Sequence, residues 1–141
     1  MGNREVVQSI YDASQTGDVA TIQRVLADDV VLFEPAHHPA VLADRDHETP
    51  GVWRGRDDVV IGITKVFTAL RLAGVTLHTI VADGDRAVGL LDVKGTDHNG
   101  RPYSMPMAEV FTLADGQVTE IRAFYFDTTE LCALAGVPVN G

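Results

Sequence analysis

The chain has 141 residues, 45% of them apolar, and this combination predicts one folded domain over residues 1–141 rather than a disordered chain. The formal net charge of -9 argues against nucleic acid and anionic membranes as partners, since both need basic surfaces. The single cysteine excludes an internal disulfide and a multi-cysteine metal site. Because there is no signal-peptide core and no apolar run of roughly 18 residues, we expect a cytoplasmic protein that does not span a membrane.

Helical spacing of apolar residues dominates the first part of the chain. It predicts one helix over residues 4–15 and a second that begins at the N-cap Asp18 and ends at Asp28-Asp29. A β-branched run over 30–33 predicts a strand. The segment 35–56 contains three prolines and is predicted to be a long loop, and loops of this length are usually functional or disordered.

The second part of the chain is predicted to be mostly strands. A third helix, capped by Asp57-Asp58, ends at Gly74. Four strands follow, separated by turns such as Asn99-Gly100, over residues 75–82, 87–93, 103–113 and 118–126. A capping box over 127–130 predicts a short C-terminal helix. Helices followed by an antiparallel meander indicate an α+β fold.

Two carboxylates lie in segments that are otherwise apolar. Glu34 ends the run that begins at Val30, and Glu109 lies between methionines and Phe111. An ionised carboxylate away from water is costly, so such a group is usually paired, protonated or functional. Two of them in one domain predict a shared pocket in which a proton can be transferred.

Structural roles are the alternatives for both acids. Glu34 can be a solvated carboxylate at a strand end that pairs with Arg54 or Arg56. Because β alternation leaves both faces of its strand apolar, Glu109 is expected to be buried, where its structural role would be a hydrogen bond to Tyr11 or Tyr125.

The order and spacing of several short motifs resemble the nuclear transport factor two-like superfamily. Within it, the chain is most similar to ketosteroid isomerases, limonene-epoxide hydrolases and SnoaL-like polyketide cyclases. The motifs are Gly17-Asp18, Ala27-Asp28-Asp29, Glu34-Pro35, Trp53-Arg54-Gly55-Arg56, Asn99-Gly100 and Ile121-Arg122-Ala123-Phe124-Tyr125. The resemblance covers nearly the whole chain. It implies a curved antiparallel sheet wrapped around three N-terminal helices, with a cone-shaped pocket.

The resemblance to ketosteroid isomerases implies a role for each acid. Glu34 occupies the place of their general base, and Glu109 that of a protonated acid that donates to the developing oxyanion, a known division of labour in those enzymes. Their oxyanion tyrosine matches Ile10, so Tyr11 is one residue off, about 100° around a helix.

Epoxide hydrolases of this fold imply a different set of acids. Their Arg-x-Asp pair and last-strand Asp match Leu90, Asp92 and Ala123, of which only the aspartate is present. Epoxide opening is therefore disfavoured, while Asp92 stays a third catalytic candidate. Its alternative is an ion pair with Lys94 or across the strands.

The candidates for binding a substrate are mainly aromatic: Tyr11, His37, Trp53, Phe67, Phe111 and Tyr125. The segment 36–52 is expected to lie outside the core as a mobile lid, with His37 and His38 at the pocket mouth. His37, His38, His47, Asp44 and Asp46 have no recognised ligand spacing, so we predict no metal site and no cofactor.

The leading hypothesis is a cofactor-independent enzyme that acts through an enolate on a hydrophobic, carbonyl-bearing small molecule, as an isomerase or a cyclase. The alternative is a non-catalytic small-molecule binding protein or a dimeric interaction module of the same fold. Epoxide opening by Asp92 and Glu34 has lower weight. A homodimer is expected because one sheet face would expose an apolar strip of Ala108, Val110, Phe124 and Phe126.

Overall fold

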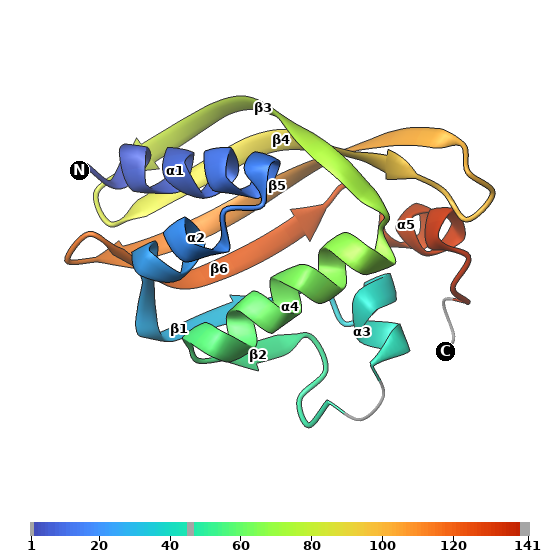
Figure 1. The fold of residues 1–141 in the computed structure, drawn as a ribbon, viewed down its shortest axis with the longest axis horizontal. Helices are drawn as coiled ribbons and strands as arrows, with labels where there is room; N and C mark the ends of the chain where they lie inside the picture. Colours follow the sequence, from blue (N-terminus) through green and yellow to red (C-terminus); the bar gives the residue numbers. More distant parts are fainter. Residues whose placement is uncertain (1, 45–46, 139–141) are drawn as a thin grey trace.

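The computed structural model describes residues 2–44 and 47–138. Over these residues it has five helices and one curved, unclosed sheet of six strands (Figure 1). The elements in chain order are α1 Asn3–Thr16, α2 Val19–Val25, β1 Leu26–Phe33, α3 Pro39–Ala43, β2 Val52–Arg54, α4 Arg56–Ala69, β3 Leu72–Asp83, β4 Arg86–Thr96, β5 Pro102–Ala114, β6 Gln117–Tyr125 and α5 Thr128–Ala135.

The sheet has the strand order β2-β1-β6-β5-β4-β3. Strands β3 to β6 form the predicted antiparallel meander, and the α+β class is confirmed. The predicted curved sheet is present, and it is mixed rather than antiparallel throughout, since β1 pairs with β6 in parallel, with Leu32 opposite Ile121. The reason is that β1 comes from the helical half of the chain and joins the sheet beside the last strand of the meander.

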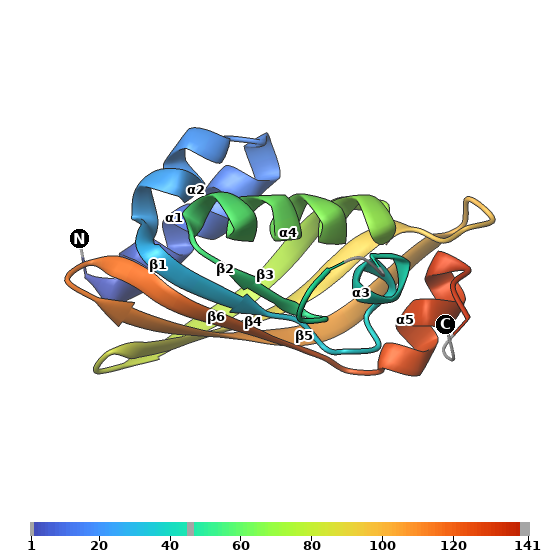
Figure 2. The same ribbon diagram turned by 90° about the horizontal axis from the view of Figure 1, so that it is seen from below.

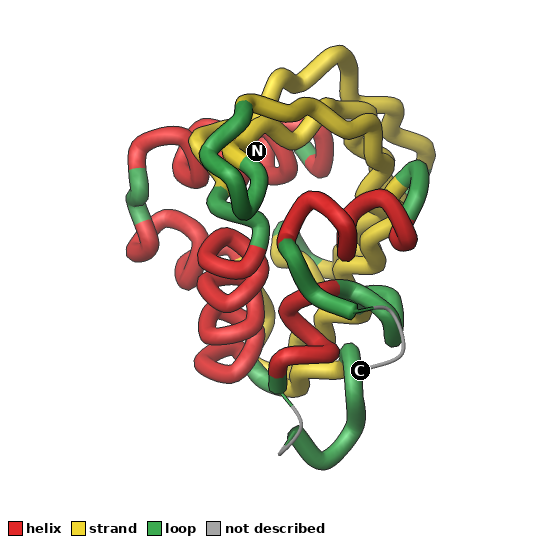
Figure 3. The backbone as a smooth tube through the Cα atoms, turned by 90° about the vertical axis from the view of Figure 1, so that its right-hand side faces the viewer, coloured by secondary structure: helices red, strands yellow, loops and turns green. Residues whose placement is uncertain are grey.

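Helices α1, α2 and α4 lie on one side of the sheet (Figure 2). Seen from the end, the strands curve around these helices (Figure 3). Their inward faces supply the core: Val7 and Ile10 from α1 and Val59 from α4 are buried together with Phe111 from β5. This curvature creates the concave surface on which the candidate site lies.

The segment predicted as a long loop is partly ordered into α3 and β2. His38 caps α3 through its ring, Nδ1 of which accepts a hydrogen bond from the amide of Ala40, and Pro39 stands at the start of the helix. Ala40 and Val41 are buried, so the expectation that this segment stays outside the core is wrong. The described part of 36–52 packs against neighbouring helices, and Asp46 lies outside the described residues.

The third predicted helix ends earlier than expected. Helix α4 stops at Ala69, and Arg71 has a left-handed backbone with φ of 47°, which breaks the helix. Strand β3 therefore begins at Leu72, and Gly74 lies within it at an irregularity of the register. None of the helices in the described part of the chain is long and apolar enough to span a membrane.

Candidate active site

A cavity lies between α1, α4 and the concave face of the sheet, with about 620 Å³ of empty space that includes part of the open solvent. Its wall is aliphatic and aromatic apart from five polar residues, Tyr11, Ser14, Glu34, Glu109 and Tyr125. Among the described residues, no lysine, arginine or histidine lines it. The cavity therefore combines an apolar wall with acidic groups that have no cationic partner.

Strand geometry brings the two glutamates to this cavity. Glu34 follows the last residue of β1, and its amide donates a hydrogen bond to the carbonyl of Gly51 at 2.8 Å. Glu109 lies in the middle of β5, on the same face as Met107 and Phe111, which also line the cavity. The structure thus joins two acids that are far apart in the sequence.

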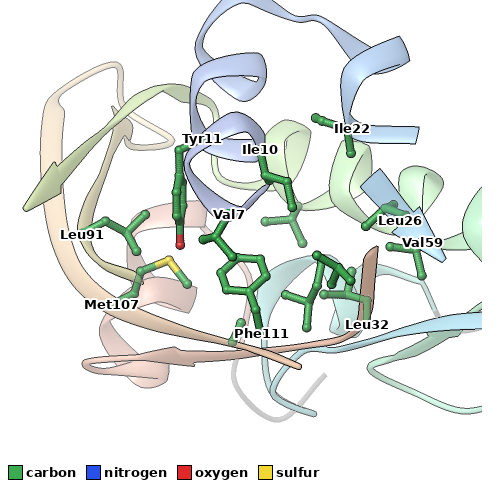
Figure 4. Close-up of a cluster of buried hydrophobic side chains, with 14 of the residues drawn as sticks. Val7, Ile10, Tyr11, Ile22, Leu26, Leu32, Val59, Leu91, Met107 and Phe111 are labelled. Atoms are coloured by element: carbon green, nitrogen blue, oxygen red, sulfur yellow. The ribbon is translucent and has the colours of Figure 1, made fainter. Parts of the chain in front are cut away.

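Tyr11 holds one of the two acids. Its hydroxyl donates a hydrogen bond to Oε1 of Glu109 at 2.9 Å, and its ring packs edge-on against Phe111. Figure 4 shows Tyr11 pointing from α1 toward the sheet. Although Tyr11 is one residue from the place of the isomerases' tyrosine, it reaches the cavity as its candidacy for substrate binding requires, because Ile10 and Tyr11 both belong to the buried face of α1 and both line the cavity.

Glu34 has a different environment. Its Oε2 atom is buried and has no hydrogen-bond partner among the described residues. The nearby Tyr125 hydroxyl opposes the rise in the Glu34 pKa by acting as a donor. No hydrogen bond of standard geometry joins the two groups in the described structure. An unpartnered oxygen is costly for a carboxylate, so this environment favours the neutral form of Glu34.

Burial raises the pKa of both acids. For Glu34 the pKa lies well above its usual range because of burial first and the negative charge of Glu109 second. Burial also raises the pKa of Glu109, while the Tyr11 hydrogen bond opposes the rise. Glu109 therefore ionises first, and its charge keeps the proton on Glu34.

Both tyrosines remain proton donors. Burial raises the pKa of Tyr11 above its ordinary value, and the charge of Glu109 raises it further. The pKa of Tyr125 is raised well above its ordinary value by burial and then by the charges of Glu34 and Glu109. Two neutral hydroxyls and one protonated carboxyl can thus donate hydrogen bonds beside one carboxylate.

Six of the predicted site residues meet at this cavity: Tyr11, Glu34, Phe67, Glu109, Phe111 and Tyr125. Asp92 does not. It alternates with the buried Leu91 and Val93, so its side chain lies on the outer face of the sheet, where Nε2 of His78 is 3.0 Å from its Oδ2. The prediction that Asp92 shares a site with the glutamates is wrong because of this alternation.

Trp53 and His37 also lie away from the cavity. Trp53 is buried under α4, where a Cβ on Gly62 would lie 2.6 Å from its ring, so it is a core residue. His37 is exposed, and its carbonyl accepts a hydrogen bond from Sγ of Cys132 at 3.0 Å. No residue of the described parts of 36–52 lines the cavity, so the structure gives the lid expectation no support.

Two residues outside the cavity wall lie against cavity residues: His38, which the sequence places with His37 at the pocket mouth, and Gly89, which the sequence analysis does not single out. The His38 ring is fully buried and lies 5.0 Å from the ring of Tyr125, and burial lowers its pKa to about 3. Gly89 faces Glu109 across the β4–β5 pair. The sequence signal for Gly89 was available, since a glycine inside a strand often marks close approach of another group.

Metal binding has little support in the described residues. They contain no group of three or more histidine, cysteine, aspartate or glutamate side chains that could hold a metal ion. Of the two cavity acids, Glu109 accepts a hydrogen bond from Tyr11, and Glu34 has a buried oxygen with no partner among the described residues. The chemistry that these groups can perform is therefore proton transfer and hydrogen-bond donation.

Comparisons with known proteins confirm the resemblance seen in the sequence. Residues 7–121 match the model of the SnoaL-like domain, so the chain belongs to this family. An uncharacterized protein of Mycobacterium tuberculosis is 28% identical over 126 residues, which cover 87% of this chain and 88% of that protein.

Solved structures of other proteins have a similar fold. IdmH of Streptomyces antibioticus, provisionally described as a polyketide cyclase, is 26% identical with a TM-score of 0.72, over 97% of this chain and 100% of that one. A nuclear transport factor two-like protein of unknown function from Burkholderia pseudomallei is 24% identical with a TM-score of 0.77, over 96% and 98% of the two chains.

Proposed function

We propose that the protein is a cofactor-independent acid–base enzyme that moves a proton on a hydrophobic, carbonyl-bearing small molecule through an enolate. The observation that carries this proposal is the pair of glutamates with raised pKa in one apolar cavity, flanked by two neutral tyrosines. Groups with opposed protonation states in one pocket are the usual requirement of such chemistry. The likeness to IdmH, with its description as a polyketide cyclase, supports the same class of reaction.

The hydrogen bonding favours a division of labour opposite to the one that the ketosteroid isomerases suggest. Glu109 accepts a hydrogen bond from Tyr11, which stabilises its charged form. Glu34 has a buried oxygen without a partner and lies in the field of Glu109, which stabilises its neutral form. Glu109 is therefore our proposed general base, and Glu34 the proposed acid.

The proposed step begins with the Glu109 carboxylate. Tyr11 occupies its Oε1, and the other oxygen takes a proton from the carbon beside the substrate carbonyl. The C–H electron pair forms a carbon–carbon double bond, and the carbonyl oxygen becomes an enolate oxygen, to which Glu34 and Tyr125 donate. Glu109 then returns the proton to another carbon, which shifts a double bond, or the enolate carbon attacks a second carbonyl, which closes a ring and leaves an alkoxide that takes up the proton from Glu109.

The cavity wall indicates the charge of the substrate. No cationic side chain among the described lining residues can pair with a carboxylate or phosphate, and the Glu109 carboxylate would repel one. The substrate is therefore proposed to be uncharged and largely apolar. Epoxide opening by Asp92 and Glu34 is not proposed, since Asp92 lies on the opposite face of the sheet.

Hydrogen–deuterium exchange tests the proposal without knowledge of the product. Cyclic enones and polyketide-like diketones are incubated with the protein in D₂O, and loss of the proton beside the carbonyl is followed by NMR. We expect exchange that depends on the protein and disappears in Glu109→Gln, with Asp92→Asn as the matched control. A ligand that binds in the cavity without any increase in exchange would favour the alternative of a non-catalytic binding protein.

A further inference from the structure

Gly89 lies in the middle of β4, an interior strand between β3 and β5, where glycine weakens a strand. A Cβ built on it would lie 2.1 Å from the Tyr11 hydroxyl oxygen, 2.7 Å from Cζ and 2.9 Å from Cε2. All three of its nearest neighbours belong to one phenol ring. No side chain fits at this position while Tyr11 keeps its place.

The same glycine lies directly opposite Glu109 in the β4–β5 pair. The Tyr11 ring is thus confined on the strand side by Gly89 and contacts Phe111 with its edge, and its hydroxyl ends 2.9 Å from Oε1 of Glu109. We propose that Gly89 is a positioning residue, whose missing side chain forms the slot through which the Tyr11 hydroxyl reaches Glu109. Its importance for turnover rests on the proposed function, whereas the slot itself does not.

The consequence for Glu109 follows from the groups that face it. These are Tyr11 from α1, Glu34 after β1 and Tyr125 from β6, while β4 contributes only the uncharged Gly89. Tyr11 is the one group whose hydrogen bond lowers the pKa of Glu109. Since a side chain at position 89 would displace Tyr11, the pKa of Glu109 should then rise.

The test compares two glycines that each lie against an aromatic ring. Gly89→Ala removes the slot, and Tyr11→Phe removes the hydroxyl. Gly62→Ala is the matched control, because its Cβ would lie 2.6 Å from Trp53, a residue that does not line the cavity. The ¹³C-labelled glutamate carboxyls are titrated by NMR, so the readout needs no substrate. Glu109→Gln assigns the signal.

We expect Gly89→Ala and Tyr11→Phe to shift the Glu109 titration to higher pH by similar amounts, with no further shift in the double variant. Gly62→Ala should lower stability and leave the titration unchanged. A folded Gly89→Ala with the wild-type titration, or an equal shift in Gly62→Ala, would overturn the proposal.

If Gly89→Ala does not fold, a second double variant, Gly89→Ala with Tyr11→Leu, decides. Tyr11→Leu removes the hydroxyl, Cζ and Cε2, all of which would lie within 3.0 Å of the new Cβ, so under the proposal it should restore stability to Gly89→Ala in thermal unfolding. A double variant that is no more stable than Gly89→Ala alone would contradict the proposal. If the wild-type protein does not catalyse proton exchange, the proposed function is refuted, while the proposed role of Gly89 in positioning Tyr11 still stands.

Discussion

The two faces of the sheet carry acids of the same type with different properties. On the concave face, Glu109 is partly buried, lines the same cavity as Glu34 and accepts a hydrogen bond from Tyr11. On the outer face, Asp92 is partly exposed and lies 3.0 Å from an exposed histidine, His78. Burial raises the pKa of Glu109 in the cavity of the concave face, whereas Asp92 lines a shallow hollow of the outer face.

This difference shows that β alternation decides which carboxylate can do chemistry. Positions 89, 91 and 93 of β4 are buried on the concave side, and positions 90, 92 and 94 face outward. A change of one position along a strand would therefore move an acid between the concave face, where it loses contact with water, and the outer face, where solvent screens its charge. Each of the following predictions tests one consequence of that contrast.

The largest expected effect is on catalysis. Glu109→Gln keeps the shape of the side chain and removes the proposed base, so proton exchange from a ketone substrate should fall by about 10²–10⁴-fold. Asp92→Asn on the outer face should leave the rate within about twofold of wild type, since it lies outside the cavity. Equal losses in both variants would show that the faces are not functionally distinct.

The next effect is on stability. Phe111 is 1% exposed and contacts Tyr11, so Phe111→Ala should lower the free energy of unfolding by about 3–5 kcal/mol. Phe124, on the outer face, is 52% exposed, so Phe124→Ala should change the unfolding free energy of the single chain by less than about 1 kcal/mol. Denaturant unfolding measures both values, and a similar loss in the two variants would contradict the contrast between the faces.

The pH dependence of stability contrasts two histidines. The pKa of the buried His38 is lowered from 6.5 to about 3, so the unfolded chain binds a proton in this window that the folded chain does not. Stability should therefore fall as the pH drops from 6.5 toward 3, by up to about 1.4 kcal/mol per pH unit. His38→Asn retains a helix-capping oxygen and should remove this part of the acid sensitivity.

The control for this prediction is the exposed His78. His78→Asn should leave the acid sensitivity as it is in wild type, because its side chain is 54% exposed. Unfolding in denaturant at pH 7, 5 and 4 provides the comparison. An unchanged slope in His38→Asn would show that another group causes the loss of stability.

The smallest effect on the fold is expected from the outer apolar strip. We propose that this face pairs with a second copy of the chain, since Phe126 is 81% exposed and Phe124 lies beside it in the same shallow hollow. Phe126→Glu should yield a monomer with wild-type unfolding behaviour. Sedimentation at micromolar concentration measures the assembly, and a monomeric wild-type protein would refute this interface.

The sequence was enough to predict the fold class, the meander and the two glutamates of the cavity. The glutamates stood out because their flanks are apolar, and apolar flanks on both faces of a strand imply burial whichever face the acid occupies. The parallel pairing of β1 with β6 was beyond local patterns, since it joins residues about 90 positions apart.

Asp92 and α3 show where local patterns fail. Which face of β4 turns inward depends on the register with β5, and Leu90, Asp92 and Lys94 alternate as regularly as the inward residues. In the segment 36–52, prolines suggested a loop, yet Pro39 begins a helix that His38 caps. The close approach of Tyr11 to Gly89 depends on how α1 sits on the sheet.

NMR titration of ¹³C-labelled glutamate carboxyls in Glu34→Gln, Glu109→Gln and wild-type protein measures whether Glu109 ionises while Glu34 keeps its proton. We expect Glu109 to titrate first, above the ordinary value of 4.5, and Glu34 to titrate at lower pH in Glu109→Gln than in wild type because the opposing charge is gone. Two carboxyls that titrate independently near 4.5, unchanged by either substitution, would contradict this expectation.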